Sequence, residues 1–212
     1  ASGSETLTTP SDDEVPLTLF VPFGPGPFPA VVLTPGAAFA PDLYVSYGAH
    51  LASWGFIVVV PDLPGSLLSP RSDLQLMEVL RQVVDWVETA DAAPTGLLAG
   101  KVDLTRVALA GHALGGKLSV YLATQDARAA AVFGIDPVDP AGGTWGNDLT
   151  NYPSVTPELM SLLTVPLGLV GETTNAQPSG LNPACAPEAN NFHQFFVAAP
   201  GPALEIEVLG AN

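Results

Sequence analysis

The chain has 212 residues, of which 47% are hydrophobic, and this length and composition suit one globular domain and exclude a disordered chain. Only 6 residues are Lys or Arg against 21 Asp or Glu, a formal net charge of −15, so the surface repels phosphate backbones and anionic membranes. No apolar run approaches the roughly 20 residues of a membrane span. We therefore expect neither nucleic acid nor a membrane span.

The hydrophobic pattern predicts strands that alternate with helices. Residues 1–15 are polar and are expected to be flexible, and residues 16–22 alternate like an edge strand bounded by prolines. Continuous apolar runs predict buried strands over 30–34, 56–60, 107–110, 131–135, 167–170 and 204–209. Helical spacing predicts helices over 42–54, 73–89 and 114–124. This alternation predicts one α/β domain over 16–212, a doubly wound and mostly parallel sheet flanked by helices.

The most specific motif follows the predicted strand 107–110. Gly111-His112-Ala113-Leu114-Gly115-Gly116 matches the strand–turn–helix pattern G-x-S-x-G of a nucleophile elbow, with alanine where the serine stands. The elbow residue lies in a strained turn, and side chains at Gly111 and Gly115 would clash with the neighbouring strand and helix. The motif thus predicts the geometry of a nucleophile without the nucleophile.

With this motif the sequence resembles the α/β-hydrolase superfamily, and within it the chlorophyllases and the PET-hydrolase or cutinase-like serine esterases. The likeness covers residues 16–212 and rests on the stretches 30–38, 55–62, 111–116, 134–138 and 183–196. It implies the α/β-hydrolase fold and a serine carboxylesterase that acts on a hydrophobic ester. It implies neither a metal nor an organic cofactor.

The resemblance assigns site residues position by position. Ala113 occupies the nucleophile position, and the backbone amides of Leu114 and Ala37 would form the oxyanion hole. Asp136, at the end of the predicted strand 131–135, takes the place of the triad acid in the chlorophyllase branch. Asp139 is an alternative acid or a partner of Asp136 around a cation. Glu172 is a second alternative, although the cutinase-like acid position two residues beyond it is a threonine.

The resemblance also expects a catalytic histidine in the loop after the last strand. The sequence has three histidines, His50, His112 and His193, and none of them follows the strand predicted at 204–209. We expect the base just beyond Asn212, in a C-terminal part of the fold that is missing here and that a separate chain could supply. His193, in a Phe-rich helix, is the alternative.

Ala113 allows two interpretations. In the first, the chain is an inactive nucleophile-to-Ala form of an active esterase. In the second, it is a natural pseudo-hydrolase that binds a hydrophobic ligand or a protein partner without catalysis. Neither form hydrolyses esters by the serine route.

Two further expectations concern substrate and compartment. Phe39, Leu43, Tyr44, Leu67 and Trp145 are expected to line an apolar cleft for a hydrophobic acyl or alcohol group. The small polar start of the chain and its scarcity of lysine fit a secreted or periplasmic protein.

Overall fold

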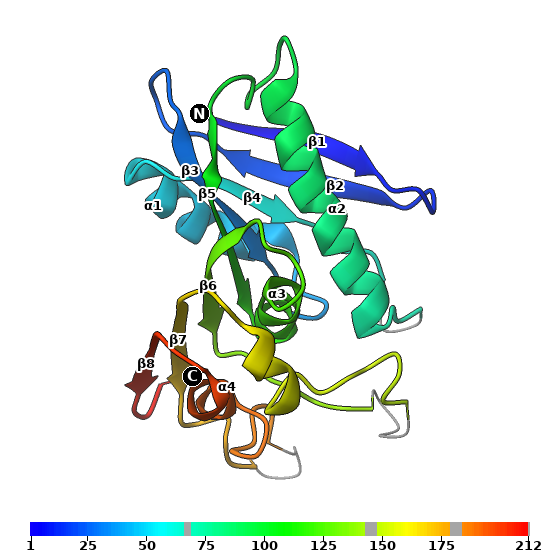
Figure 1. The fold of residues 1–212 in the computed structure, drawn as a ribbon, viewed down its shortest axis with the longest axis vertical. Coiled ribbons are helices and arrows are strands. Elements are labelled where there is room, and N and C mark those ends of the chain that lie inside the picture. Colours follow the sequence, from blue (N-terminus) through cyan, green and yellow to red (C-terminus); the bar gives the residue numbers. More distant parts are fainter. Residues whose placement is uncertain (66–68, 143–147, 179–183, 212) are drawn as a thin grey trace.

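The computed structural model describes residues 1–65, 69–142, 148–178 and 184–211. These residues form one eight-stranded sheet in the order β1-β2-β4-β3-β5-β6-β7-β8 (Figure 1). The strands are β1 (Ser2–Thr8), β2 (Glu14–Phe20), β3 (Phe28–Thr34), β4 (Ile57–Pro61), β5 (Val102–His112), β6 (Ala129–Ile135), β7 (Leu167–Glu172) and β8 (Ala203–Val208). Strands β3 to β8 run parallel to one another, whereas β2 is antiparallel to both of its neighbours, β1 and β4.

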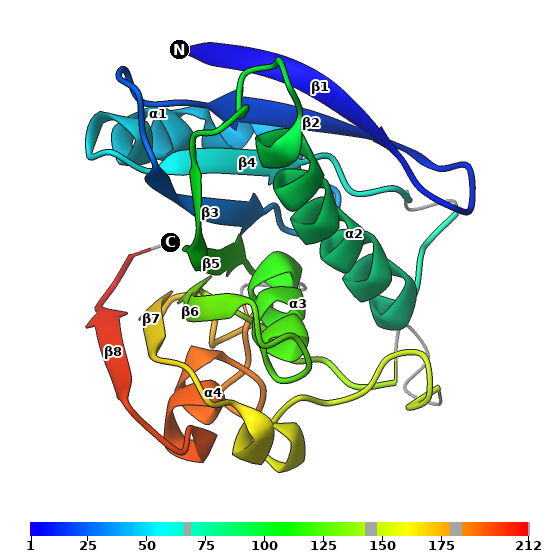
Figure 2. The ribbon, with the colours of Figure 1, turned by 45° about the horizontal axis from the view of Figure 1, so that its top comes forward.

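The helices are distributed unequally over the two faces of the sheet. Helices α2 (Asp73–Ala92), α3 (Leu114–Ala123) and α4 (Phe192–Ala198) cover one face, and α1 (Val45–Ser53), preceded by the short helix η1 (Pro41–Tyr44), covers part of the other. A second short helix, η3 (Glu158–Leu162), packs against α4. In Figure 2 α2 and α3 lie over the sheet on the side opposite α1.

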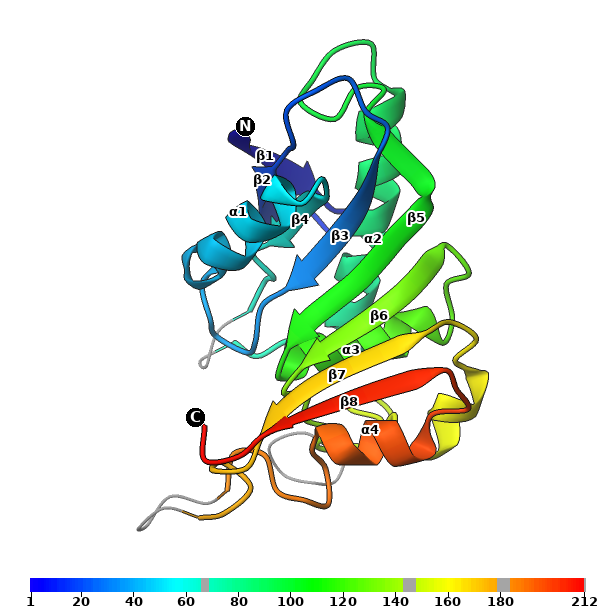
Figure 3. The ribbon, with the colours of Figure 1, turned by 90° about the vertical axis from the view of Figure 1, so that its left-hand side faces the viewer.

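The face on the α1 side is only half covered. Figure 3 shows α1 in front of β2 and β4, while none of the described helices lies over β6, β7 and β8 on this side. One row of paired residues crosses this face from Leu33 through Ala110, Phe133 and Gly168 to Leu204. Leu33 is 1% exposed, whereas Phe133 and Leu204 are 38% and 59% exposed. Parallel sheets are normally covered on both faces, so this apolar area is unusual.

The N-terminal segment differs from expectation. Residues 1–15, expected to be flexible, contain β1, which pairs with β2 from Ser2 opposite Phe20 to Thr8 opposite Glu14. β2 is therefore the second strand of the sheet and not an edge strand. The side chains of β1 are mostly exposed and polar, so its backbone hydrogen bonds hold it without the apolar pattern that sequence reasoning uses.

The predicted helices and strands are found with shifted ends. The strand predicted as buried at 204–209 is not buried: β8 is the last strand of the sheet, and its side chains are mostly exposed. The helix predicted at 42–54 is divided into η1 and α1, and Gly55 after it takes a φ of +91° as a helix-terminating glycine. β5 starts at Val102, earlier than predicted, and α2 continues to Ala92. Ser72 and Gln75 form a capping box at the start of α2. No helix in the described part of the chain is long and apolar enough to cross a membrane.

Candidate active site

Ala113 lies in a sharp turn between β5 and α3. Its φ of +47° and ψ of −117° are a conformation that residues with a side chain rarely adopt. The Ala113 N–H donates to the carbonyl of Ile135 at the end of β6, over 3.0 Å. A Cβ added at Gly111 would lie 2.2 Å from the carbonyl oxygen of Gly115, so the turn closes only with glycine there. The predicted elbow geometry is present.

The loop after β3 lies beside the elbow. A Cβ at Gly115 would lie 2.3 Å from the carbonyl oxygen of Thr34 and 2.4 Å from that of Pro35. This contact brings Ala37, which is exposed, to the same cleft as Leu114. Leu114 is the first residue of α3, where a backbone N–H has no partner within the helix. The arrangement is compatible with the two predicted oxyanion donors.

Tyr44 joins the oxyanion loop to the elbow. The Gly36 N–H donates to the Tyr44 hydroxyl over 2.9 Å, and this hydroxyl lies 2.9 Å from Nδ1 of His112. Burial raises the pKa of Tyr44 and lowers the pKa of His112, so burial favours the neutral form of both groups in this hydrogen bond. Tyr44 is 5% exposed. It therefore supports the loop from below and does not line the cleft as predicted.

Asp136 follows β6 directly, beside the elbow. Its φ is +45°, and its N–H donates to the carbonyl of Val170 on β7 over 2.6 Å. Its Oδ1 is buried and has no hydrogen-bond partner among the described residues. Burial, and secondarily the charge of Glu172, raise the pKa of Asp136 to about 6. A carboxylate oxygen is thus available to a partner at the position predicted for the triad acid.

The two alternative acids have other partners. Asp139 is buried, with one carboxylate oxygen 3.0 Å from Lys117 Nζ and the other accepting from residues 154–156. Glu172 accepts from the backbone N–H groups of Thr174 and Asn175 and so braces the loop after β7. Neither carboxylate is available to orient a base unless these contacts break, and Asp139 cannot share a cation with Asp136 without leaving Lys117.

The three histidines are spread over the molecule. His112 contacts Tyr44 as described. His193 is half-exposed on α4, where Nδ1 lies 2.9 Å from a Glu205 carboxylate oxygen and the ring centroid lies 6.3 Å from that of Phe196. His50 lies on α1 with its ring 6.2 Å from that of Trp54. The hydrogen-bond partners found for His112 and His193 do not include Asp136.

A cleft of about 760 Å³ opens beside the oxyanion loop and the start of α3. Phe39 lines it as predicted. Leu43 is 60% exposed and is not among the lining residues, and the predicted Leu67 and Trp145 lie outside the described residues. Apolar lining that sequence reasoning missed comes from Leu63, Leu76, Leu114 and Leu118. The leucines on α2 and α3 could not be recognised as cleft residues from the sequence, since leucines in the core show the same helical spacing.

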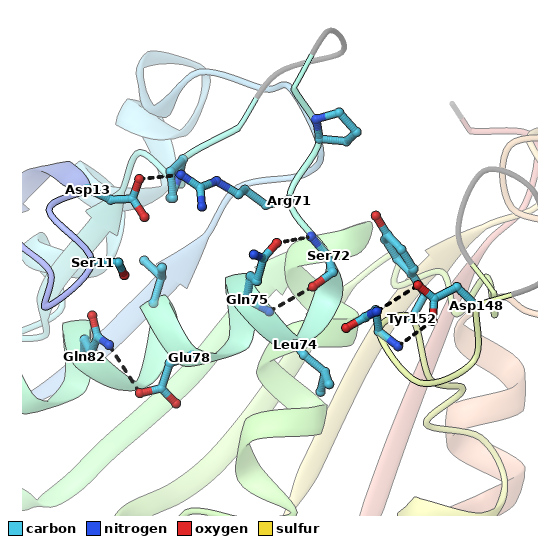
Figure 4. A pocket seen from close by; sticks show the side chains of 14 residues that line it. Ser11, Asp13, Arg71, Ser72, Leu74, Gln75, Glu78, Gln82, Asp148 and Tyr152 are labelled. Atoms are coloured by element: carbon cyan, nitrogen blue, oxygen red, sulfur yellow. Dashed lines mark hydrogen bonds and ion pairs between the residues drawn. The ribbon is translucent and has the colours of Figure 1, made fainter.

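A second, more polar cavity of about 510 Å³ adjoins this cleft, and the two share Pro64, Pro70, Arg71 and Tyr152. Figure 4 shows its side chains tied to one another: Arg71 to Asp13, Ser72 to Gln75, and Gln82 to Glu78. Most of its polar groups therefore pair with one another, whereas Oε1 of Gln82 is buried without a hydrogen-bond partner among the described residues.

Comparison with known proteins decides the family. A family model described as chlorophyllase matches residues 4–208. The chain belongs to the chlorophyllase family. Chlorophyllase-1 of Citrus sinensis is 29% identical over 186 residues, which cover 85% of this chain and 53% of the relative. Chlorophyllase-2 of Arabidopsis thaliana is 28% identical over 203 residues, covering 88% and 60%. This chlorophyllase-family chain thus spans little more than half the length of these relatives.

Solved structures agree on the fold. An alpha/beta hydrolase from Penicillium superposes with a TM-score of 0.73 at 16% identity, covering 100% of this chain and 90% of that one. Esterase 2 of Thermogutta terrifontis, phosphorylated by paraoxon, superposes with a TM-score of 0.73 at 14% identity, covering 99% and 83%. The predicted doubly wound α/β-hydrolase fold of this chlorophyllase-family member is confirmed.

Proposed function

We propose that this chain is the scaffold of a carboxylic-ester hydrolase of the serine type, inactive here because alanine stands at position 113. The observation that carries the proposal is the backbone of Ala113, which keeps the positive φ and the glycine neighbours of an elbow. This geometry costs roughly 1–2 kcal/mol in an alanine and serves no packing purpose that we can identify. It suits a serine whose hydroxyl must point into the cleft.

In the active form, the hydroxyl of a serine at 113 attacks the ester carbonyl and gives its proton to a histidine. Asp136, through its unpartnered Oδ1, fixes the tautomer of that histidine and stabilises the imidazolium. The backbone amides of Ala37 and Leu114 stabilise the oxyanion of the tetrahedral intermediate. The alcohol leaves, and water then hydrolyses the acyl-enzyme.

The base itself is proposed to lie in residues that follow position 212 in a longer protein, on the same chain or supplied as a separate one. The relatives' greater length supports this, as this chain covers 53% and 60% of two chlorophyllases. The uncovered face over β6–β8 offers apolar area against which such residues would pack. Export to a secreted or periplasmic location remains part of the proposal, and it rests on composition alone.

The substrate is proposed to be a hydrophobic ester. The cleft beside the oxyanion loop is lined by Phe39, Leu63, Leu114 and Leu118, which favour an apolar acyl or alcohol group. The relatives are named chlorophyllases, so a large hydrophobic alcohol is the first class to test, and a polyester is the second.

A natural pseudo-hydrolase is the second candidate. Ala113 itself favours it, because a chain with this residue keeps the cleft and lacks the nucleophile. Such a protein would retain a hydrophobic ligand without turning it over.

The test is Ala113→Ser in the protein that carries the residues after position 212. We expect hydrolysis of p-nitrophenyl butyrate and a paraoxon adduct on residue 113, seen by mass spectrometry. The matched control, Ala113→Ser with Asp136→Asn, should lose on the order of 10⁴-fold in kcat. If a folded Ala113→Ser protein shows no hydrolysis and no adduct, the esterase proposal is overturned. Retention of a hydrophobic ligand by that protein would then favour the pseudo-hydrolase.

A further inference from the structure

Lys117 is a charged residue at the centre of the molecule. It follows residue 113 by one turn of α3, and its side chain is 0% exposed. Its Nζ lies 2.8 Å from Oδ2 of Asp73, 3.0 Å from Oδ1 of Asp139 and 2.7 Å from the carbonyl oxygen of Pro140. The contact with Pro140 is a hydrogen bond. The contacts with the two carboxylates are ion pairs, in which Asp73 Oδ2 and Asp139 Oδ1 accept no hydrogen bond among the described residues.

Asp139 is fixed from its other side as well. Its second oxygen accepts from the Ser154 hydroxyl, from the Val155 and Thr156 N–H groups and from the Thr156 hydroxyl, all within 2.8–2.9 Å. Hydrogen bonds to an ionised carboxylate are stronger than neutral ones. Asp139 therefore anchors the loop before η3 and the segment after β6 to one ammonium group.

The segment 136–140 meets the elbow at two further points. The Val138 N–H points at the carbonyl oxygen of Ala113, over 3.5 Å, and Pro137 packs on Gly116, where an added Cβ would lie 2.8 Å from it. Asp136 begins this segment with a positive φ, a conformation that the surroundings must hold in place. The contact to Ala113 is long. Two backbone hydrogen bonds hold the segment from its other side, since the Asp136 N–H donates to the Val170 carbonyl over 2.6 Å and the Asp139 N–H to the Asn190 carbonyl over 2.8 Å. The Lys117 contacts add the anchor that comes from the elbow helix.

Buried ion pairs contribute little net stability, because removing charges from water offsets their attraction. Replacing a buried ion pair by apolar residues of the same volume is often neutral for stability. Lys117 lies on α3, the helix after the elbow, and its ammonium group contacts the segment that carries Asp136. This position indicates a role other than stability.

We propose that Lys117 is a positioning residue, whose contacts with Asp139 and Pro140 hold the 136–140 segment, and with it Asp136, at a fixed place beside residue 113. Asp73 neutralises the ammonium from α2 and so joins a third element to the same point. The inference rests on the proposed function in one respect, namely the role of Asp136 as the triad acid.

The first test needs no catalysis. The side-chain carboxyl of Asp136, assigned by its loss in Asp136→Asn, is titrated by ¹³C NMR in the chain with Ala113. We expect a midpoint near pH 6 in the unmodified chain and a fall of at least about one unit in Lys117→Met, because a released segment exposes the carboxyl to water. Lys101→Met, at the far end of β5, is the control and should leave the midpoint in place. An unchanged midpoint in a folded Lys117→Met protein would overturn the proposal.

A second variant covers the case in which Lys117→Met does not fold. Lys117→Met combined with Asp73→Asn and Asp139→Asn removes the two carboxylates that lose their ion-pair partner and should fold, yet it lacks the ionic anchor. The Asp136 midpoint should fall in this variant as well. If it stays near pH 6, the network does not position Asp136.

The third measurement uses the active form with Ala113→Ser. There Lys117→Met should lower kcat on the order of a hundredfold with KM changed less than threefold, since a shift of about 1 Å in a catalytic group has such an effect. Lys117→Arg should restore part of the rate. If Ala113→Ser shows no hydrolysis, the esterase proposal fails, while the carboxyl titration still decides the role of Lys117. Equal effects of Lys117→Met and Lys101→Met on kcat would contradict positioning.

Discussion

At the scale of single residues, two residues of the site hold energetically unfavourable arrangements that the present side chains do not require. Ala113 holds a backbone conformation suited to glycine, and Asp136 holds a carboxylate oxygen away from both water and partners. In each case the surroundings impose the conformation: the glycines of the elbow in the first, the hydrogen bond to β7 in the second. Each cost can be measured by removing its cause.

Ala113→Gly should raise the free energy of unfolding by about 1 kcal/mol. Glycine adopts the positive φ without the steric cost of a Cβ, and this gain exceeds its extra freedom in the unfolded chain. Urea denaturation measures the change. Ala49→Gly, an exposed position inside α1, is the control and should lower the free energy of unfolding by about 1 kcal/mol. A destabilised Ala113→Gly protein would contradict the assignment of strain to residue 113.

The pKa of Asp136 predicts a dependence of stability on pH. The folded value of about 6 lies above the ordinary 3.8, so between about pH 4 and pH 6 the folded state binds the proton that the unfolded state has lost. The free energy of unfolding should therefore fall as pH rises through this window. We expect a contribution of about 1 kcal/mol, reduced by partial exposure of the carboxyl.

Asp136→Asn should remove this part of the pH profile. The profiles of the two proteins, from thermal unfolding at pH 4 to 8, should converge at the acidic end and diverge toward neutral pH, with the variant more stable there. Asp73, whose pKa burial also raises, contributes in the same direction in both proteins and cancels from the difference. Profiles that stay parallel would contradict a raised pKa at Asp136.

At the scale of elements, the contact between the end of β3 and the start of α3 places the two oxyanion donors. Gly115→Ala would put a methyl group within 2.4 Å of two backbone oxygens, and neither strand nor helix can yield easily. We expect it to lower the free energy of unfolding by about 3 kcal/mol. Gly100→Ala is the control, because Gly100 has a φ of +65° and an added Cβ would meet nothing within 4 Å. This variant has backbone strain without steric overlap, and it should lower the free energy of unfolding by only about 1 kcal/mol. If chemical denaturation gives similar losses of unfolding free energy for Gly115→Ala and Gly100→Ala, the contact between the end of β3 and the start of α3 is not tight.

Elements with a marked apolar pattern were predictable, and those held by polar contacts were not. The apolar runs at 30–34 and 56–60 predicted buried strands. The glycines of the elbow motif predicted that a side chain at Gly111 or Gly115 would clash with its neighbours. β1 was not predicted because its side chains are mostly exposed and show no apolar pattern. Tyr44 was expected in the cleft because the sequence does not show which way its hydroxyl points. Lys117 offered a signal that was not used: it is a charge within the otherwise apolar sequence of α3.

At the scale of the whole molecule, the two faces of the sheet differ in how much they contribute to stability. Leu169 on β7 is 0% exposed against the α2–α3 side, whereas Ile206 on β8 is 47% exposed on the open side. We expect Ile206→Ser to change the free energy of unfolding by less than about 1 kcal/mol and Leu169→Ala to lower it by about 3 kcal/mol. Chemical denaturation of the two variants measures this. A loss above about 2 kcal/mol for Ile206→Ser would mean that the side chain is covered in solution.

The burial of Lys117 also determines where the protein can be chemically coupled. The chain has two lysines, and the amine of Lys117 is enclosed and charged. Lys101, which is partly exposed, precedes β5 at the end of that strand opposite the elbow. Amine-reactive resins and dyes should therefore attach through Lys101 in preference to Lys117, and an immobilised or labelled molecule would present its cleft to the solution.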